Sequence, residues 1–412
     1  MTSAAITPHV PTTTVAITGG FVVPVASDPI EGGTVVIEDG IITAVGLDVA
    51  IPEGATVVDA SGKWVLPGFI EPHGHVGIHE EANGVAGDDT NEMTNPNMAA
   101  ARAIDAINID DEGFVDALSG GVTSVVVKPG SGNPIGGLTV AIKTWGGRTI
   151  DEQLISNAVS VKSALGENPK RVYGAKDKTP STRMGVALII RQAFEDARHY
   201  VAQREHAATK GEPFRRDLWL DTLARVLDGE LAWDQHAHRH DDIATALRLA
   251  DEFGYRLVVN HGTEGHKLAD ILAAKNIPVI FGPMFTSRSK VELRDRAISN
   301  LAALAAAGVK VAITTDHPVI PINFLVHQAS FAVTEGLPRQ IALEALTVNS
   351  AAVLGLENRI GSLTEGLDGD VVIWSADPLD TTSRAETVFI GGIQVYTWDA
   401  ETRRGSASTR FE

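Results

Sequence analysis

The pattern of hydrophobic and polar positions differs between the two ends of the chain and its middle. Short β-branched runs separated by Gly, Pro and Asp-Gly turns fill residues 12–65, and a similar pattern returns after residue 370. Asp39-Gly40 and Gly391-Gly392 each stand between two such runs, as two-residue hairpin turns do. We therefore expect the two ends to pack together as one small β-sandwich. The runs are Thr14–Ile17, Thr34–Ile37, Ile41–Val45, Thr56–Val58, Asp370–Trp374, Thr387–Ile390 and Gln394–Thr397.

Between these ends, strand-like runs alternate with segments whose apolar residues recur at i, i+3 and i+4. This alternation is typical of parallel βαβ units. The candidate strands are Trp64–Ile70, Thr123–Lys128, Thr139–Thr144, Ala158–Leu165, Leu231–Gln235, Arg256–Asn260, Pro278–Phe281 and Lys310–Thr314. The helical segments include Asp241–Phe253, Gly265–Lys275, Val291–Ala307 and Ile341–Leu356. The pattern predicts an α/β protein, with a (β/α)₈ TIM-type barrel over residues 67–356 and a composite β-sandwich from residues 1–66 and 357–412.

Composition narrows the possible functions of this fold. The chain has 412 residues, of which 44% are hydrophobic and 21% charged, as in ordinary soluble globular proteins. A formal net charge of -18 argues against non-specific binding to nucleic acid or to an anionic membrane. No stretch approaches the ~18 apolar residues of a membrane span, and residues 1–20 lack the pattern of a secretory signal. We expect a cytoplasmic protein whose partner is a small-molecule substrate, and which forms a homo-oligomer.

The candidate chemistry lies at the carboxyl ends of the predicted strands. His73 and His75 follow strand one at i and i+2, a spacing that points both imidazoles to one face. His236 ends strand five, His261 ends strand six and Asp316 ends strand eight. Because the carboxyl ends of barrel strands meet at one mouth, these five side chains are expected to lie together.

Such a set of donors suits a metal ion. Four neutral imidazoles and one carboxylate are ligands that Zn²⁺ prefers, and Mn²⁺ or Fe²⁺ also fit; the chain has no cysteine to offer a thiolate. A single histidine is more often a hydrogen-bonded core or surface residue. Five candidates at the ends of four different strands favour a site for one or two ions. His238 shares a face with His236 and is an alternative to it, although His236 directly follows the apolar strand residues and is preferred.

These motifs resemble those of the amidohydrolase superfamily. The segment Leu66–Pro72 followed by His73-Gly74-His75, and then His236, His261 and Asp316, is most similar to the imidazolonepropionase-like metal-dependent hydrolases. The tail Gly361–Trp374 matches the return of that family into its sandwich, and the resemblance covers residues 13–398. It implies hydrolysis of an amide or cyclic C–N bond, with Asp316 as both metal ligand and general base.

Two residues remain candidates for the metal ligand contributed by strand four. Relatives carry either a carboxylated lysine on this strand or a glutamate on an earlier one, and this chain offers Lys162 within the strand and Glu167 at its end. An unmodified, protonated lysine has no lone pair for a metal, so Glu167 is slightly favoured. Lys128, at the end of strand two, is a third candidate.

Other residues are candidates for substrate binding. Tyr173 and Arg183 follow strand four and are placed to bind a substrate carboxylate, while His317 adjoins Asp316 and is placed to orient it or to contact the substrate. Two other functions compete with hydrolysis. One is deamination or isomerisation on the same metal barrel, and the other is a metal-free homologue that acts as a scaffold.

Overall fold

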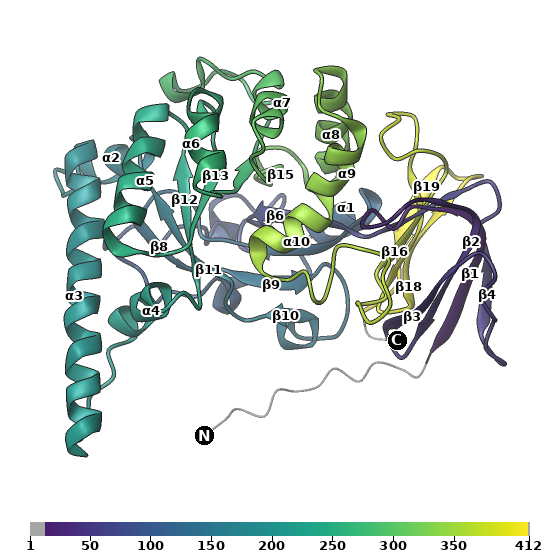
Figure 1. Ribbon diagram of the computed structural model, residues 1–412, viewed down its shortest axis with the longest axis horizontal. Coiled ribbons are helices and arrows are strands. Elements are labelled where there is room, and N and C mark those ends of the chain that lie inside the picture. The colour runs from purple at the N-terminus through teal and green to yellow at the C-terminus, as the bar shows by residue number, and fades with distance from the viewer. Residues whose placement is uncertain (1–12, 411–412) are drawn as a thin grey trace.

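The computed structural model describes residues 13–410, and its two β-rich ends lie side by side (Figure 1). They form one hydrogen-bonded sheet of nine strands, in which β1 pairs with β2 on one side and with β4 and β5 on the other. Antiparallel pairing of β5 with β16 joins the two ends of the chain, with Val65 opposite Ile373. The strands are β1 (Thr14–Val22), β2 (Ile30–Glu38), β3 (Ile41–Gly46), β4 (Thr56–Asp59), β5 (Trp64–Pro67), β16 (Val371–Trp374), β17 (Ala385–Ile390), β18 (Ile393–Asp399) and β19 (Arg404–Ala407).

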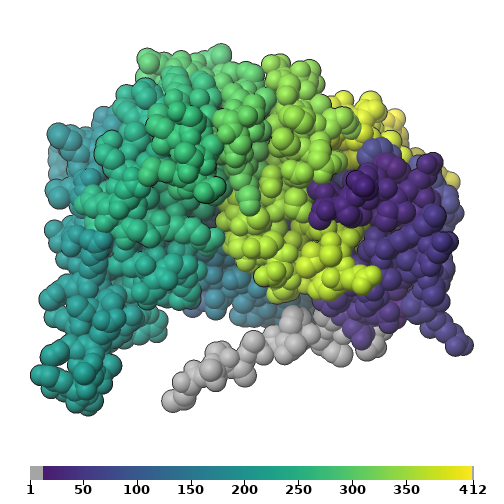
Figure 2. All heavy atoms as spheres, viewed as in Figure 1, coloured from purple at the N-terminus to yellow at the C-terminus, as the bar shows by residue number. Residues whose placement is uncertain are grey.

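Both predicted hairpin turns are confirmed. Asp39 and Gly40 have φ values of 49° and 83°, and Gly391 and Gly392 have φ values of 55° and 74°. Positive φ at both central residues matches the right-handed twist of the flanking strands. In the space-filling view the yellow-green residues that follow residue 350 lie between the green helical part of the molecule and the purple N-terminal strands (Figure 2).

The middle of the chain confirms the predicted alternation of strands and helices. A four-stranded sheet has the order β10-β9-β7-β6, and a six-stranded sheet has the order β15-β14-β13-β12-β11-β8. The backbone of His75 donates to the carbonyl of His317 at 2.9 Å, so the segments that follow β6 and β15 are neighbours. The strands are β6 (Phe69–Gly74), β7 (Val122–Val127), β8 (Ile135–Leu138), β9 (Val140–Lys143), β10 (Leu154–Ser156), β11 (Ser160–Ala164), β12 (Ala232–Ala237), β13 (Leu257–His261), β14 (Val279–Phe281) and β15 (Val311–Ile313).

The prediction for the third strand was wrong in direction. The chain forms β8 and β9 on either side of Thr139, and these run antiparallel to β11 and β7 respectively. Residues 128–134 separate β7 from β8, whereas a parallel connection needs a dozen or more residues, usually with a helix. The strands β6–β7 and β11–β15 are parallel, as predicted.

The first predicted strand, Trp64–Ile70, is divided at Gly68. Its first half, β5, belongs to the nine-stranded sheet, and its second half, β6, belongs to the α/β part. The backbone N–H of Gly68 donates to the carbonyl of Asp370 at 3.0 Å, and a side chain at Gly68 would collide with Thr123. The chain therefore crosses from one sheet to the next at a glycine.

Helices cover the strands of the α/β part (Figure 1). The helices are α1 (Gly113–Ser119), α2 (Glu167–Gly174), α3 (Arg183–Lys210), α4 (Leu218–Leu227), α5 (His240–Phe253), α6 (Ala269–Ala274), α7 (Ser299–Ala306), α8 (Leu325–Thr334), α9 (Arg339–Leu346) and α10 (Val348–Leu354). Within the described range, no helix combines the length and the apolar character needed to cross a membrane.

Two predicted helices are interrupted. The predicted helix Val291–Ala307 is divided into a short 3-10 helix at residues 291–293 and α7. In the segment that separates them, the carbonyl of Asp295 accepts a hydrogen bond from the side chain of Asn300. Ile341–Leu356 breaks at Thr347, whose φ of -135° and ψ of -99° are not helical and whose hydroxyl donates to the carbonyl of Leu343 at 2.6 Å. These local hydrogen bonds compete with those of a continuous helix.

Candidate metal centre

Two groups of potential metal ligands lie at the carboxyl ends of the strands. One group is His73, His75 and Asp316, and the other is His236, His238 and His261. Within each group, one donor atom from every residue lies within 4.8 Å of the others. The structure thus brings the five predicted residues into two clusters and adds His238 to His236 instead of replacing it.

The first cluster joins the end of β6 to the segment after β15. Oδ1 of Asp316 lies 3.2 Å from Nε2 of His73 and 3.3 Å from Nε2 of His75. The second ring nitrogen of each histidine, Nδ1, has its own hydrogen-bond partner. Nδ1 of His73 lies 2.7 Å from Oδ1 of Asn260, and Nδ1 of His75 lies 2.6 Å from the carbonyl oxygen of Lys128. Both partners are acceptors, so each Nδ1 carries the proton and each Nε2 presents a lone pair.

The second cluster contains an imidazole that lacks partners. Nδ1 of His261 bonds the carbonyl of Gly282 at 2.8 Å, and Nδ1 of His238 bonds the hydroxyl of Thr263 at 2.8 Å. His236 is buried, and among residues 13–410 neither of its ring nitrogens has a hydrogen-bond partner. An unsatisfied buried polar group is costly unless something binds it. A divalent ion bound by these imidazoles would satisfy His236, so the donor set fits a metal.

The protonation states also suit metal ligands. Burial lowers the pKa of His73, His236 and His238 well below the usual range, and it lowers the pKa of His261 to about 3. Burial opposes ionisation of Asp316, but the neighbouring imidazoles hold the pKa of its carboxyl well below the usual value. The histidines are therefore neutral and the aspartate is ionised, as metal binding requires.

The strand-four candidates lie in different places. Lys162, on β11, is 1% exposed, and its Nζ lies 3.3 Å from Nε2 of His73 and 3.1 Å from the carbonyl oxygen of Pro129. Burial lowers the pKa of Lys162 to about 8. Glu167 begins α2, where its backbone N–H donates to Glu292 at 2.9 Å, and its side chain belongs to neither ligand cluster. The structure places Lys162 against the first cluster and Glu167 outside both, and which of the two binds a metal stays a prediction.

Lys128 is engaged elsewhere. Its buried ammonium pairs with Asp234 and lies 3.3 Å from Oδ1 of Asn260, whose amide in turn bonds Asp234. Because Asn260 also contacts Nδ1 of His73, this buried network orients a candidate ligand of the first cluster. Lys128 itself, as an ammonium group paired with Asp234, has no lone pair to offer a metal.

Glu71 is a buried site residue that the sequence pattern did not reveal. Its carboxylate accepts from the backbone of His73 at 3.0 Å, and from the backbone and hydroxyl of Thr315 at 2.8 and 2.6 Å. Burial raises the pKa of Glu71 to about 7. The carboxyl links the segments that carry His73 and Asp316. The only feature of the sequence that could have indicated Glu71 is its position two residues before the candidate ligand His73.

Backbone conformation at two ligands is unusual for residues with side chains. His261 has a φ of 69° and Asp316 has a φ of 55°, both in the left-handed region. Such conformations cost of order 1–3 kcal/mol and persist where surrounding structure enforces them, often at functional sites. Each residue stands where the chain leaves a strand and turns its side chain toward the clusters.

A cavity of about 640 Å³ opens over both clusters. It is lined by Lys162 and by members of both ligand groups, together with side chains from several loops. Among the other lining residues, Asn91, Ser131, Phe285, Lys290, Val319 and Ile320 belong to loops, whereas Asn168 belongs to α2 and Leu293 to the short helix at residues 291–293. Loop residues of this kind carry no periodic signal, which is why the sequence pattern did not indicate them.

The three predicted substrate-binding residues do not line this cavity. Arg183 pairs with Asp242 at 3.0 Å and with Glu292 at 2.6 Å. Tyr173 is fully buried in α2, and burial raises its pKa to about 12. His317 is fully buried, and its Nδ1 accepts the backbone N–H of Ile322 at 3.2 Å. Ion pairing or burial keeps each of these side chains out of the cavity lining, and their role in substrate binding stays a prediction.

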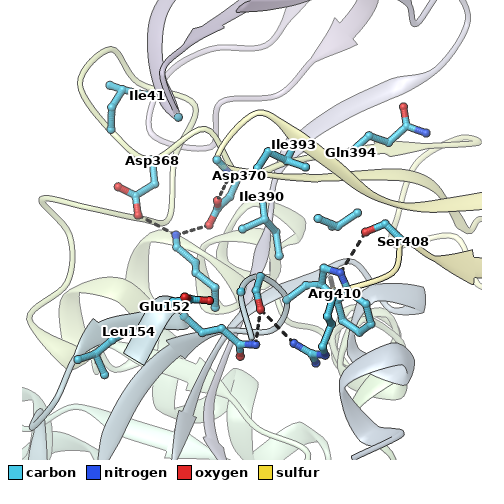
Figure 3. A pocket seen from close by; sticks show the side chains of 18 of the residues that line it. Ile41, Glu152, Leu154, Asp368, Asp370, Ile390, Ile393, Gln394, Ser408 and Arg410 are labelled. Carbon is cyan, nitrogen blue, oxygen red and sulfur yellow. Dashed lines mark hydrogen bonds and ion pairs between the residues drawn. The ribbon is translucent and has the colours of Figure 1, made fainter. Parts of the chain in front are cut away.

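A second cavity, of about 440 Å³, lies between the nine-stranded sheet and the α/β part (Figure 3). Asp368 and Asp370 converge there on the ammonium of Lys143, at 2.7 and 2.5 Å (Figure 3). Lys143 belongs to β9, and the two carboxylates lie just before the start of β16. This ion-pair cluster joins the two parts of the molecule and contains none of the metal-ligand candidates.

Comparison with known proteins identifies the family. The model of the amidohydrolase family matches residues 179–396, more than half of the chain. The chain belongs to the amidohydrolase family. Within it, the crystal structure of an amidohydrolase from Thermotoga maritima MSB8 is 42% identical, covers 92% of this chain and 99% of its own, and has a TM-score of 0.89.

Two sequence relatives extend this similarity. Amidohydrolase tasK of Hapsidospora irregularis is 29% identical over 87% of this chain, although the chain spans only 39% of that relative's length. An imidazolonepropionase of Acidiphilium cryptum is 27% identical, over 85% of this chain and 89% of the relative. The predicted resemblance to the amidohydrolase superfamily is confirmed.

Proposed function

We propose that this protein is a metal-dependent hydrolase that cleaves an amide or cyclic C–N bond. The observation that carries the proposal is the pair of buried ligand clusters, which lie beneath one cavity that Lys162 also lines. Nζ of Lys162 lies 3.3 Å from Nε2 of His73, and the ring centroid of His73 lies 5.0 Å from that of His261 in the second cluster.

His73, His75 and Asp316 would hold one divalent ion, and His236 and His261 with His238 would hold a second. Zn²⁺ is the ion that this donor set fits best, although Mn²⁺ and Fe²⁺ accept the same ligands. When bound, such an ion activates a water molecule and polarises the scissile carbonyl group. We propose a site at the mouth of a (β/α)₈-type barrel in which the third strand is reversed.

Carboxylation of Lys162 would add a carboxylate to the side chains that hold the metal in this scheme. Its neutral amine forms an N–C bond with carbon dioxide and releases one proton, which leaves an anionic carboxylate where an ammonium stood. The buried position of Lys162 favours the neutral amine that this reaction needs. The new carboxylate would also offset the positive charge of two divalent ions.

Asp316 serves as the general base. Its ionised carboxylate takes a proton from the attacking water and returns it to the leaving nitrogen as the C–N bond breaks. Contacts with His73 and His75 hold the carboxylate beside the reacting centre. Because the candidate ligands are all present and gathered, the geometry favours a hydrolase over a scaffold that has lost its metal.

The metal content of the purified protein tests the proposal. We expect about two equivalents of zinc, manganese or iron per chain, and hydrolysis of a panel of acylated amino acids, dipeptides and cyclic ureides that a chelator abolishes. Re-addition of zinc should restore the activity. Less than half an equivalent of metal after careful purification, with no hydrolysis, would support the scaffold instead.

A further inference from the structure

Lys290 occupies an unusual position in the wall of the main cavity. It lies in the loop after β14, directly before the short helix Val291–Leu293, and it lines the cavity above the ligand clusters. His236 and His238 line the same cavity. Over residues 13–410, no carboxylate comes within 4.0 Å of Nζ of Lys290.

The carboxylates that share the cavity are already engaged. Asp316 contacts both histidines of the first cluster. Asp88 accepts the backbone and hydroxyl of Thr90, at 3.2 and 2.6 Å, and lies 3.4 Å from Nδ1 of His79. Lys290 therefore presents an uncompensated positive charge to whatever enters the cavity.

The loop that carries Lys290 is anchored on both sides. Two residues further on, Glu292 accepts from Nη2 of Arg183 at 2.6 Å and from the backbone of Glu167 at 2.9 Å. Before it, the carbonyl of Met284 accepts from Nη1 of Arg296 at 2.7 Å. The anchors position the backbone around Lys290, so its charge has a defined place relative to the clusters. Arg183 and Glu167 thus support the cavity wall without lining it.

Apolar side chains supply another part of the lining. Phe285, Leu293, Val319 and Ile320 all face the cavity. Phe285 and Val319 are 37% and 52% exposed, which is high for large apolar side chains of a folded protein. An apolar substituent of a bound molecule would cover them and gain hydrophobic free energy. The cavity volume is within the range of sites for small organic ligands.

We propose that Lys290 binds a carboxylate of the substrate, and that the substrates are small amides bearing both a carboxylate and an apolar group, such as N-acyl derivatives of apolar amino acids. This inference rests on the proposed hydrolase function and names its substrate class. No arginine stands among the described residues that line the cavity, and a single ammonium group matches a singly charged carboxylate. Lys290 is a specificity-determining residue in this scheme and takes no part in bond cleavage.

Two probes that differ only in the carboxylate test the proposal. N-acetyl-L-leucine carries it, and N-(3-methylbutyl)acetamide is the same amide without it. Both are assayed with zinc-loaded wild-type protein, with Lys290→Met, and with Lys290→Arg, which keeps the charge. Lys210→Met, on an exposed lysine at the end of α3, is the matched control. Initial rates give KM and kcat, and isothermal titration calorimetry measures binding where no hydrolysis occurs.

We expect Lys290→Met to raise KM or Kd for N-acetyl-L-leucine by roughly tenfold or more, with little change in kcat and no change for the neutral amide. Lys290→Arg should restore most of the loss, and Lys210→Met should match wild type. Equal effects on both probes, no effect on either, or no preference of the wild type for the anionic probe would overturn the assignment. If neither probe is hydrolysed but the anionic one binds through Lys290, the hydrolase proposal loses support while the carboxylate site stands.

Discussion

Oδ1 of Asp316 lies 3.2 Å from Nε2 of His73, although the two residues belong to the last and first strand ends of the α/β part. The contact depends on the backbone hydrogen bond from His75 to His317 and on the hydroxyl of Thr314, which donates to the carbonyl of His73 at 2.7 Å. A carboxylate and an imidazole at this distance could both bind the same metal ion.

Asp316→Asn should abolish most of the hydrolysis and weaken metal binding. An amide neither accepts a proton at neutral pH nor supplies the charge of a carboxylate, so we expect kcat to fall by about 10²–10⁴-fold. Steady-state kinetics and metal analysis of the same preparation check both effects. Asp270→Asn, at an exposed position in α6, should leave both quantities unchanged. Full activity of Asp316→Asn would show that the base is another residue.

Lys162→Met and Glu167→Gln distinguish the two strand-four candidates. If carboxylated Lys162 helps to hold two ions, the methionine variant should retain at most one equivalent of zinc and lose most activity, because its side chain cannot be carboxylated. Glu167→Gln should keep two equivalents, since Glu167 belongs to neither cluster. Metal analysis after dialysis, with added bicarbonate, measures the difference. The reverse pattern would return the role to Glu167.

Gly282→Ala should destabilise the protein more than Gly254→Ala. Both glycines have positive φ, 143° and 78°, so both substitutions share the cost of a side chain in that conformation. A side chain at Gly282 also collides with the carbonyl of Thr314, whereas nothing lies within 4 Å of one at Gly254. We expect Gly282→Ala to lower the free energy of unfolding by about 3 kcal/mol.

Denaturant unfolding of both glycine variants measures this difference. Because the carbonyl of Gly282 accepts from Nδ1 of His261, zinc affinity should also fall in Gly282→Ala. Equal losses of stability in the two variants would mean that conformation alone, and not the contact with Thr314, accounts for the effect.

Lys143→Met should weaken the junction between the two parts of the molecule. The lysine side chain is 12% exposed, and its loss leaves Asp368 and Asp370 with less compensation in a buried site. Removing one partner from a buried ion pair typically costs about 3–5 kcal/mol. Lys275→Met, which breaks the more exposed pair with Asp251, should cost under about 1 kcal/mol. Thermal unfolding compares the two, and similar shifts in Tm would contradict the argument.

Local patterns were enough to predict much of the fold. Alternating β-branched runs and paired turn residues indicated the strands of both ends, because turn conformation depends on residues adjacent in the chain. The third strand was misjudged because hydrophobic pattern does not encode direction. Its antiparallel course follows from the short connection at residues 128–134.

The sequence by itself determined the candidate donors His73, His75, His236, His261 and Asp316, because strand periodicity and the shared edge of parallel strands bring their side chains to one end of the fold. Only the tertiary structure decided that Lys162 lies against His73, that Glu167 and Arg183 support a loop, and that Lys290 lines the cavity. These roles depend on contacts between loops distant in the chain. Such contacts are set by packing and burial, which no local sequence pattern records.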